Sequence, residues 1–248
     1  MTTARLPLFP LNTVLFPGLV LPLNVFEERY RAMMRELLKT PDDSDVPRRF
    51  VVVAIRDGHQ LAPSLPGLPD ESVEPDIGPA AGFGEDPLLA FHQVGCVADA
   101  ATIREREDGT FEVLATGTTR VRLHALDASG PFLTAEVEEL PEDDGDGAGA
   151  LAEGVLRAFR AYQKRLAGAS ERTLASASEL PDDPSVVSYL VAAATVLDTP
   201  SRQRLLEAPT VAARLRIELG LLRSETALIR NLPSLPAVDL TRAPTSLN

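Results

Sequence analysis

The sequence predicts an α+β protein with strands in the first half of the chain and helices in the second. Residues 94–139 alternate apolar and polar side chains around an Asp108-Gly109 turn, which is typical of antiparallel strands with one buried face. Composition changes at residues 140–150 (LPEDDGDGAGA), an acidic, glycine-rich stretch that we expect to separate two subdomains. After this stretch, helix-capping residues followed by proline precede apolar residues at helical spacing.

The N-terminal segment is expected to form two short strands, a helix and a buried strand. Prolines and a glycine divide residues 6–23 into two extended segments with a turn between them. Asn24 is a suitable N-cap, and Glu27 three residues later completes a capping-box pair, so a helix is predicted to follow. Its core-facing side is expected to carry the apolar residues at helical spacing, Phe26, Tyr30, Met33, Met34, Leu37 and Leu38. Residues 50–55 (FVVVAI) are a continuous, mostly β-branched run that indicates a buried strand.

Residues 57–89 are rich in proline and glycine and are expected to form a long loop without a helix of normal length. Apolar side chains on a segment too irregular to bury them all could present a contact surface for another polypeptide. The candidate peptide-binding residues are Leu65, Leu68, Phe83, Leu88 and Leu89. The alternative is that these side chains only pin the loop onto the strands.

The second half of the chain is predicted to be helical. The expected helices are Leu151–Leu166, Asp183–Leu197, Thr199–Glu207 and Thr210–Asn231. We therefore expect a strand subdomain with one helix and the long loop over residues 1–140, and a helical subdomain over 150–232. Residues 233–248 are expected to be a loose tail.

The charge balance limits the classes of partner. The net charge is −12 and no run of Lys and Arg exceeds two residues, which disfavours nucleic acid and anionic membrane surfaces. Prolines interrupt the apolar amino terminus, so it is not expected to act as a signal peptide or a membrane span. One cysteine, Cys96, cannot form an internal disulfide, and the cytoplasm is the expected location.

The known hydrolytic motifs are missing from the sequence. Of the two lysines, Lys39 follows a helical pattern instead of a glycine-rich loop, and Lys164 precedes Arg165, so neither fits a P-loop. The same two residues give no support for a Ser-Lys dyad. The string nearest to a nucleophile elbow, residues 168–172, lacks the second glycine. We expect no catalytic residues and no ATP hydrolysis.

No metal or cofactor is expected either. Cys96 lies in a strand-like VGCV context that is typical of a buried structural thiol, although a Cys-His site with one of the three histidines is the alternative. His59, His92 and His124 have no second ligand at metal spacing. The acidic stretch lacks the twelfth-position carboxylate of a calcium loop, because that position is Val155.

Four stretches resemble the amino-terminal, substrate-binding domain of Lon proteases. They are residues 6–34 (LPLFPLNTVLFPGLVLPLNVFEERYRAMM), 94–123 (VGCVADAATIREREDGTFEVLATGTTRVRL), 132–143 (FLTAEVEELPED) and 198–225 (DTPSRQRLLEAPTVAARLRIELGLLRSE). In that family a proline-punctuated opening leads to a Leu-Pro-Leu motif and a short helix. A valine-glycine pair then precedes an Asp-Gly hairpin and a second glycine before Arg-x-Arg. The resemblance covers about residues 5–230.

The resemblance implies a PUA-like β-barrel followed by an all-α helical bundle. Lon proteases continue into ATPase and peptidase domains, so we expect a stand-alone form that lacks them. The implied function is a non-catalytic module of protein quality control. It would bind apolar segments of unfolded or degron-bearing proteins, with an adaptor role for a separate protease. The alternative function is a hydrolase with an unrecognised site. RNA binding, suggested by the PUA-like fold, is disfavoured by the charge. The oligomeric state stays open.

Overall fold

The computed structural model describes residues 3–41, 46–56, 78–170 and 181–231. Within these ranges it contains six strands, five α-helices and one short 3-10 helix, so the α+β class predicted from the sequence is confirmed. The chain divides into two compact units. Unit 1 comprises Met1–Pro141 and Leu197–Glu207, and unit 2 comprises Glu142–Val196 and Ala208–Asn248.

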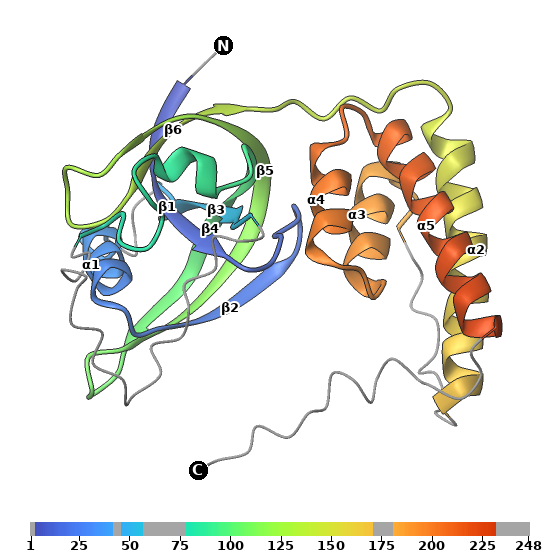
Figure 1. The fold of residues 1–248 in the computed structure, drawn as a ribbon, viewed down its shortest axis with the longest axis horizontal. Helices are drawn as coiled ribbons and strands as arrows, with labels where there is room; N and C mark the ends of the chain where they lie inside the picture. Colours follow the sequence, from blue (N-terminus) through green and yellow to red (C-terminus); the bar gives the residue numbers. More distant parts are fainter. Residues whose placement is uncertain (1–2, 42–45, 57–77, 171–180, 232–248) are drawn as a thin grey trace. The chain divides into compact units, whose positions relative to one another are not determined.

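Unit 1 is a mixed sheet with three short helices. Its elements are β1 (Thr3–Leu11), β2 (Val20–Val25), α1 (Glu28–Leu37), β3 (Arg49–Ala54), η1 (Pro87–Ala90), β4 (Val94–Glu105), β5 (Phe111–Asp127), β6 (Thr134–Glu139) and α4 (Thr199–Glu207). The strand order is β2-β5-β4-β3-β1-β6, and β6 also pairs with β5. Only β1 and β3 are parallel. The pairings of β5, β4, β3, β1 and β6 thus return to β5, and Figure 1 shows that the longer strands are strongly curved.

Strand β5 is one continuous strand of 17 residues, although the sequence pattern predicts two strands here, over residues 110–116 and 120–126. It pairs with β2 over Phe111–Thr116 and with β6 over Val121–Asp127, while β4 pairs along most of its length. Register shifts between Cys96 and Ala98 and between Leu123 and Ala125 interrupt these ladders. Such irregularities increase the local bend and twist of a strand, which explains how one strand serves three partners.

Two glycines permit close approach of neighbouring chain segments in unit 1. A Cβ atom on Gly117 would lie 2.4 Å from the carbonyl oxygen of Phe16 and 3.1 Å from the Cys96 sulfur. A Cβ atom on Gly95 would lie 2.5 Å from the carbonyl oxygen of Val52. Distances this short to backbone atoms leave no room for a side chain, so both positions require glycine.

Strand β3 is buried on both faces, as the FVVVAI run predicted. Phe50 and Val52 pack in a cluster with the α1 methionines, whereas Val51 and Val53 pack in a second cluster on the other face. The alternation of side chains along a strand therefore divides β3 between two apolar clusters. This placement explains why the run has no polar positions.

Helix α1 begins three residues later than the capping-box pattern predicted, because its N-cap is Glu27 instead of Asn24. Glu27 occupies the N-cap position without a side-chain cap bond, and Asn24 lies in β2 opposite Glu112. Pairing with β5 keeps residues up to Val25 extended, which overrides the local capping preference. The buried helical face of Met33 and its neighbours is as predicted, but Phe26 is 69% exposed instead of packed in the core.

Helix α4 belongs to unit 1, although the sequence analysis grouped it with the other helices. The buried Gln203 side chain donates from Nε2 to the Val94 carbonyl at 2.9 Å, and Arg120 donates to the Leu206 carbonyl at 2.9 Å. Thr199 donates to the Asn12 carbonyl at 3.1 Å. The expected division at residues 140–150 into two separable subdomains stays a prediction.

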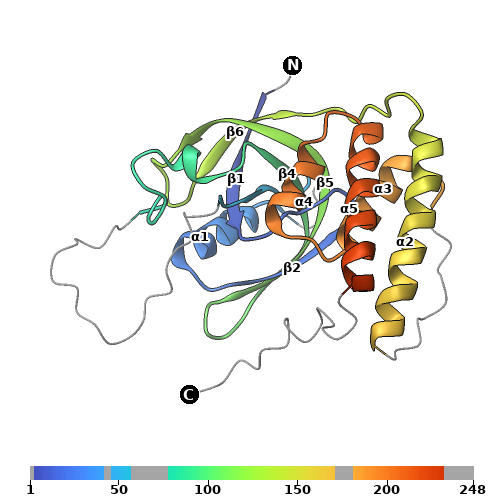
Figure 2. The same ribbon diagram turned by 45° about the vertical axis from the view of Figure 1, so that its right-hand side comes forward.

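Unit 2 contains α2 (Ala148–Ser170), α3 (Pro184–Ala194) and α5 (Val211–Asn231). The Asp183 carboxylate accepts hydrogen bonds from the first amides of α3, with Pro184 at the first helical position, as the sequence predicted. Figure 2 shows α5 running beside α2, and buried residues of all three helices form one apolar cluster. Within the described ranges, no helix is long and apolar enough to cross a membrane.

A buried arginine organises the polar contacts of unit 2. The fully buried Arg214 donates to the Ser188 hydroxyl at 3.0 Å and to a Glu142 carboxylate oxygen at 3.3 Å. Its guanidinium lies 4.0 Å from the centroid of the Tyr189 ring, and the Tyr189 hydroxyl also donates to Glu142. One side chain on α5 therefore contacts α3 and the segment that precedes α2. Buried charges need such a complete set of partners.

Glu218 is buried beside this network without a hydrogen-bond partner. Its side chain lies one turn after Arg214, and both carboxylate oxygens lack a donor among the described residues. Burial raises the pKa of Glu218 well above its ordinary 4.5, although the charge of Arg214 opposes the shift. The carboxylate form is thus disfavoured in the folded protein.

We expect Gly117→Ala to lower the free energy of unfolding by about 3 kcal/mol, because a methyl group would displace the Phe16 backbone. Gly154→Ala is the matched control. Its Cβ meets no atom within 4 Å, and alanine is the better helix former, so this variant should gain about 1 kcal/mol. Urea unfolding followed by circular dichroism measures both. Equal midpoints for Gly117→Ala and the wild type would contradict the close-approach explanation.

We expect Glu218→Gln to make the protein more stable at neutral and alkaline pH. The folded-state pKa lies above the unfolded one, so the wild type is fully stabilised below about pH 4.5 and loses stability as pH rises through the folded pKa. The variant should lack this loss and gain about 1–3 kcal/mol at high pH. Thermal unfolding across the pH range measures the difference, with the exposed Glu153→Gln as control. If the stability difference between the wild type and Glu218→Gln were the same at all pH values, the titration of the buried Glu218 carboxyl group would be excluded as its cause.

Candidate functional site

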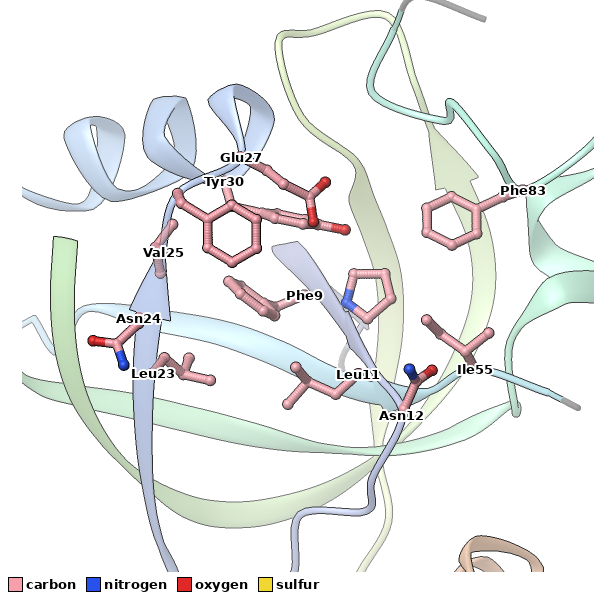
Figure 3. A pocket seen from close by; sticks show the side chains of 12 residues that line it. Phe9, Leu11, Asn12, Leu23, Asn24, Val25, Glu27, Tyr30, Ile55 and Phe83 are labelled. Carbon is pink, nitrogen blue, oxygen red and sulfur yellow. The ribbon is translucent and has the colours of Figure 1, made fainter. Parts of the chain in front are cut away.

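A pocket with a volume of about 310 Å³ opens in unit 1 between β1, β2 and the start of α1. Figure 3 shows it from close by. The residues that line it come from both strands, from α1, from the end of β3 and from the segment before η1: Phe9, Pro10, Leu11, Asn12, Leu23, Asn24, Val25, Phe26, Glu27, Tyr30, Ile55 and Phe83. This volume lies at the lower end of ligand pockets, which span about 300–1,000 Å³.

Aromatic rings form much of the pocket wall. Phe9 and Tyr30 are stacked with their ring centroids 4.5 Å apart, and the Phe50 ring packs on Phe9 at a centroid distance of 5.9 Å. Phe83 packs edge-on against Phe91 at 4.6 Å, on the side of the pocket opposite Tyr30 in Figure 3. Rings locked by such contacts offer a rigid apolar surface.

Arg29 holds two parts of this wall together. Its guanidinium donates to the Glu27 carboxylate at 2.7 and 2.9 Å and to the Ala81 carbonyl at 2.8 Å. The same group lies 4.9 Å from the Tyr30 ring centroid and 5.2 Å from that of Phe83. One arginine thereby fixes the segment around Ala81 against the start of α1. It also neutralises the Glu27 carboxylate at the rim of the pocket.

The rim carries a few polar groups. Burial raises the pKa of Tyr30 to about 12, with Arg29 opposing and Glu27 reinforcing the shift, so its hydroxyl is protonated at neutral pH. No described residue accepts a hydrogen bond from this hydroxyl, which leaves it available to donate. Asn12 and Asn24 are exposed at the edges of β1 and β2. An apolar pocket with amide and hydroxyl groups at its rim can hold a side chain and orient the adjoining backbone.

The five loop residues named from the sequence have different environments. Phe83 is 2% exposed, packs on Phe91 and lines the pocket. Leu88 is half-buried against the same apolar cluster, and Leu89 is 64% exposed. Leu65 and Leu68 lie outside the described residues. Peptide binding by these five residues stays a prediction.

Sequence patterns do not indicate a site at the other pocket residues. They predict Tyr30 on the buried face of a helix and Phe9 and Leu23 only as strand residues. The Leu-Pro-Leu segment occurs twice, at residues 6–8 and 21–23, within the two strands that flank the pocket, so this repeat was the usable signal. The arginine that fixes the wall, Arg29, carried no sequence signal for this role, because its carbonyl partner Ala81 lies 52 residues away.

The residues considered for catalysis or metal binding are separate from this pocket. Cys96 is fully buried, and its thiol contacts the Val97 carbonyl at 3.3 Å. His124 is exposed beside Glu138 at 2.9 Å, and His92 lies 3.7 Å from Glu207. His59 is outside the described residues. Among the residues that are described, no cluster of three His, Cys, Asp or Glu side chains could hold a metal ion.

Sequence comparison relates the chain to Lon proteases. It is 29% identical over 218 residues to Lon protease 2 of Herpetosiphon aurantiacus and 30% identical over 215 residues to Lon protease 2 of Syntrophobacter fumaroxidans. These alignments cover 87% and 85% of this chain but only 23% of each relative. The chain thus spans about a quarter of the length of these relatives.

Solved structures share the fold. The crystal structure of a Lon N-terminal domain protein from Xanthomonas campestris superposes with a TM-score of 0.53 at 21% identity, covering 88% of this chain and 98% of that one. The N-terminal domain of the Mycobacterium avium complex Lon protease gives 0.56 at 19% identity, covering 90% and 98%. The family described as the ATP-dependent protease La (LON) substrate-binding domain matches residues 5–224. The chain therefore belongs to the Lon substrate-binding-domain family.

Proposed function

We propose that unit 1 binds extended apolar segments of unfolded or degron-bearing polypeptides, and that the aromatic pocket takes one of their side chains. The observation that carries this proposal is the juxtaposition of a ring-lined pocket with Phe26, a large apolar side chain that lines it and is 69% exposed. An exposed phenylalanine at a pocket rim gains free energy when a partner covers it. Family membership supports the same class of ligand.

Several finer features belong to the same proposal. The closed pairing of five strands is proposed to be the PUA-like barrel, and the helices of unit 2 are proposed to act as a bundle. Leu89, exposed near the pocket residue Phe83 in sequence, is a proposed second contact for the client chain. We further propose that the module acts in the cytoplasm, in protein quality control, as an adaptor that delivers clients to a separate protease.

The pocket can be tested with a client protein that is kept unfolded by reduction and carboxymethylation and is labelled with fluorescein. The Phe26→Ser variant should bind this client about tenfold more weakly than the wild type, because it loses much of the roughly 1.5–3 kcal/mol available from covering a phenylalanine. Leu228→Ser is the matched control, since Leu228 is 51% exposed on α5 and does not line the pocket. Binding should persist at moderate salt, because an apolar contact is not screened.

Two results would reject the pocket as the site. One is the absence of wild-type binding up to about 100 μM client, which is too weak for a recognition role. The other is a folded Phe26→Ser variant that binds as tightly as the wild type. A Leu89→Ser variant, measured in parallel, separates a contribution of the loop from that of the pocket.

We also propose that the protein is not an enzyme, in preference to the hydrolase alternative. The complete burial of Cys96 leaves that thiol no access to a substrate. Purified protein should neither hydrolyse ATP nor cleave casein in steady-state assays. Turnover that survives repurification and disappears on substitution of a residue of this chain would establish the alternative.

A further inference from the structure

The helix pair of unit 2 carries a groove of about 280 Å³ between α2 and α5. Small side chains, among them Ala158, Ala161 and Ala227, line its floor, and Arg165 and Arg223 line it from the two helices. A floor of alanines permits close approach of another backbone or short side chain, because helix separation depends on the side chains at the contact.

Helices α2 and α5 start beside one another. The amides of Val211 and Ala212 donate to the Asp143 and Asp144 carbonyls at 2.8 and 2.9 Å, so α5 starts beside the acidic segment that precedes α2. Both helices run in the same direction from there, as Figures 1 and 2 show. Arg165 of α2 and Arg223 of α5 therefore both lie in the C-terminal halves of these two helices.

Five exposed cations of these helices form no ion pair with a described residue. They are Arg160, Lys164 and Arg165 on α2 and Arg216 and Arg223 on α5, of which Arg216 donates to the Asp146 carbonyl at 3.3 Å. Arg157 differs, because it lies 3.6 Å from Glu153. These residues give the two helices a local excess of positive charge, although the net charge of the whole chain is −12. Such a positively charged surface attracts an acidic partner by charge complementarity.

We propose that this groove docks an acidic segment of a partner polypeptide. Carboxylates of the partner would pair with Arg165 and Arg223, and a short apolar side chain would rest on the alanine floor between them. A peptide fits better than nucleic acid. None of the described residues that line the groove has an aromatic ring to stack on a base, and the net charge of the whole chain repels the phosphate backbone of a long nucleic acid. The proposal concerns unit 2 and is independent of the aromatic pocket of unit 1.

The probe is a fluorescein-labelled peptide of about 16 residues with a repeated Glu-Ala-Leu-Glu sequence, long enough to form a helix on binding. Two control peptides of the same length carry Gln or Lys in place of each Glu. The wild-type protein should bind the Glu peptide at least tenfold more tightly than the Gln peptide and should not bind the Lys peptide. Binding should weaken between about 50 and 300 mM salt, because exposed charges are screened.

Arg165→Glu/Arg223→Glu should weaken binding of the Glu peptide at least tenfold, and Arg165→Lys/Arg223→Lys should retain it. Arg122→Glu on the exposed face of β5 makes the same type of charge change away from the groove and should bind as the wild type. The Phe26→Ser variant should also bind the Glu peptide as the wild type does. A failure of the groove proposal can therefore be distinguished from a failure of the pocket proposal. Circular dichroism verifies that each variant is folded.

Three outcomes would overturn the proposal. The first is no binding of the Glu peptide by the wild type. The second is full binding by a folded Arg165→Glu/Arg223→Glu variant. The third is that a single-stranded oligonucleotide of similar charge binds as tightly as the Glu peptide and depends on the same two arginines. The groove would then be a general site for polyanions.

Discussion

Three strands hydrogen-bond to the single strand β5, and this shared pairing positions most of unit 1. β2 and β6 follow one another along β5, while β4 accompanies it over most of its length. The arrangement depends on Gly117, where the chain near Phe16 approaches too closely for any side chain. Because β2 is held on β5 and β1 is held by β3 and β6, the facing parts of β1 and β2 flank a pocket. A constraint in the backbone thus leads directly to the candidate site.

The pocket and the helical groove differ in the physical basis of recognition. Stacked rings and aliphatic side chains line the pocket, and the one carboxylate at its rim, Glu27, is neutralised by Arg29. The groove instead combines a small-residue floor with cations that have no ion-pair partner among the described residues, so attraction there would depend on charge and on salt. The occupants proposed for the two surfaces differ accordingly: an apolar unfolded client for unit 1 and an acidic partner for unit 2. Their contributions can be measured independently.

Buried polar contacts explain why sequence motifs far apart in the chain belong together. The Val-Gly pair of β4 and the Arg-x-Arg pair of β5 resemble family motifs, and so does the Gln before Leu-Leu-Glu in α4. In the structure the Gln203 amide bonds the Val94 carbonyl, and Arg120 bonds the carbonyl of Leu206. Each of these side chains is almost fully buried. A buried donor that loses its acceptor costs about 1–3 kcal/mol, so the motifs are linked by hydrogen bonds that hold α4 on the strands.

The sequence by itself determined the order and type of nearly all the elements, because periodicity, turn residues and helix caps such as Asp183 act within a few residues of the chain. Only the tertiary structure decided three further points, each set by contacts between distant residues. Pairing with β5 keeps Asn24 extended, so α1 begins further along the chain than the capping residues predict. Hydrogen bonds from Gln203 and Arg120 assigned α4 to unit 1. Packing against Phe91 buried Phe83 in the pocket wall, whereas Phe26, which looked like a core residue, remained exposed. Local patterns specify what a segment forms, but which surface covers it depends on long-range packing.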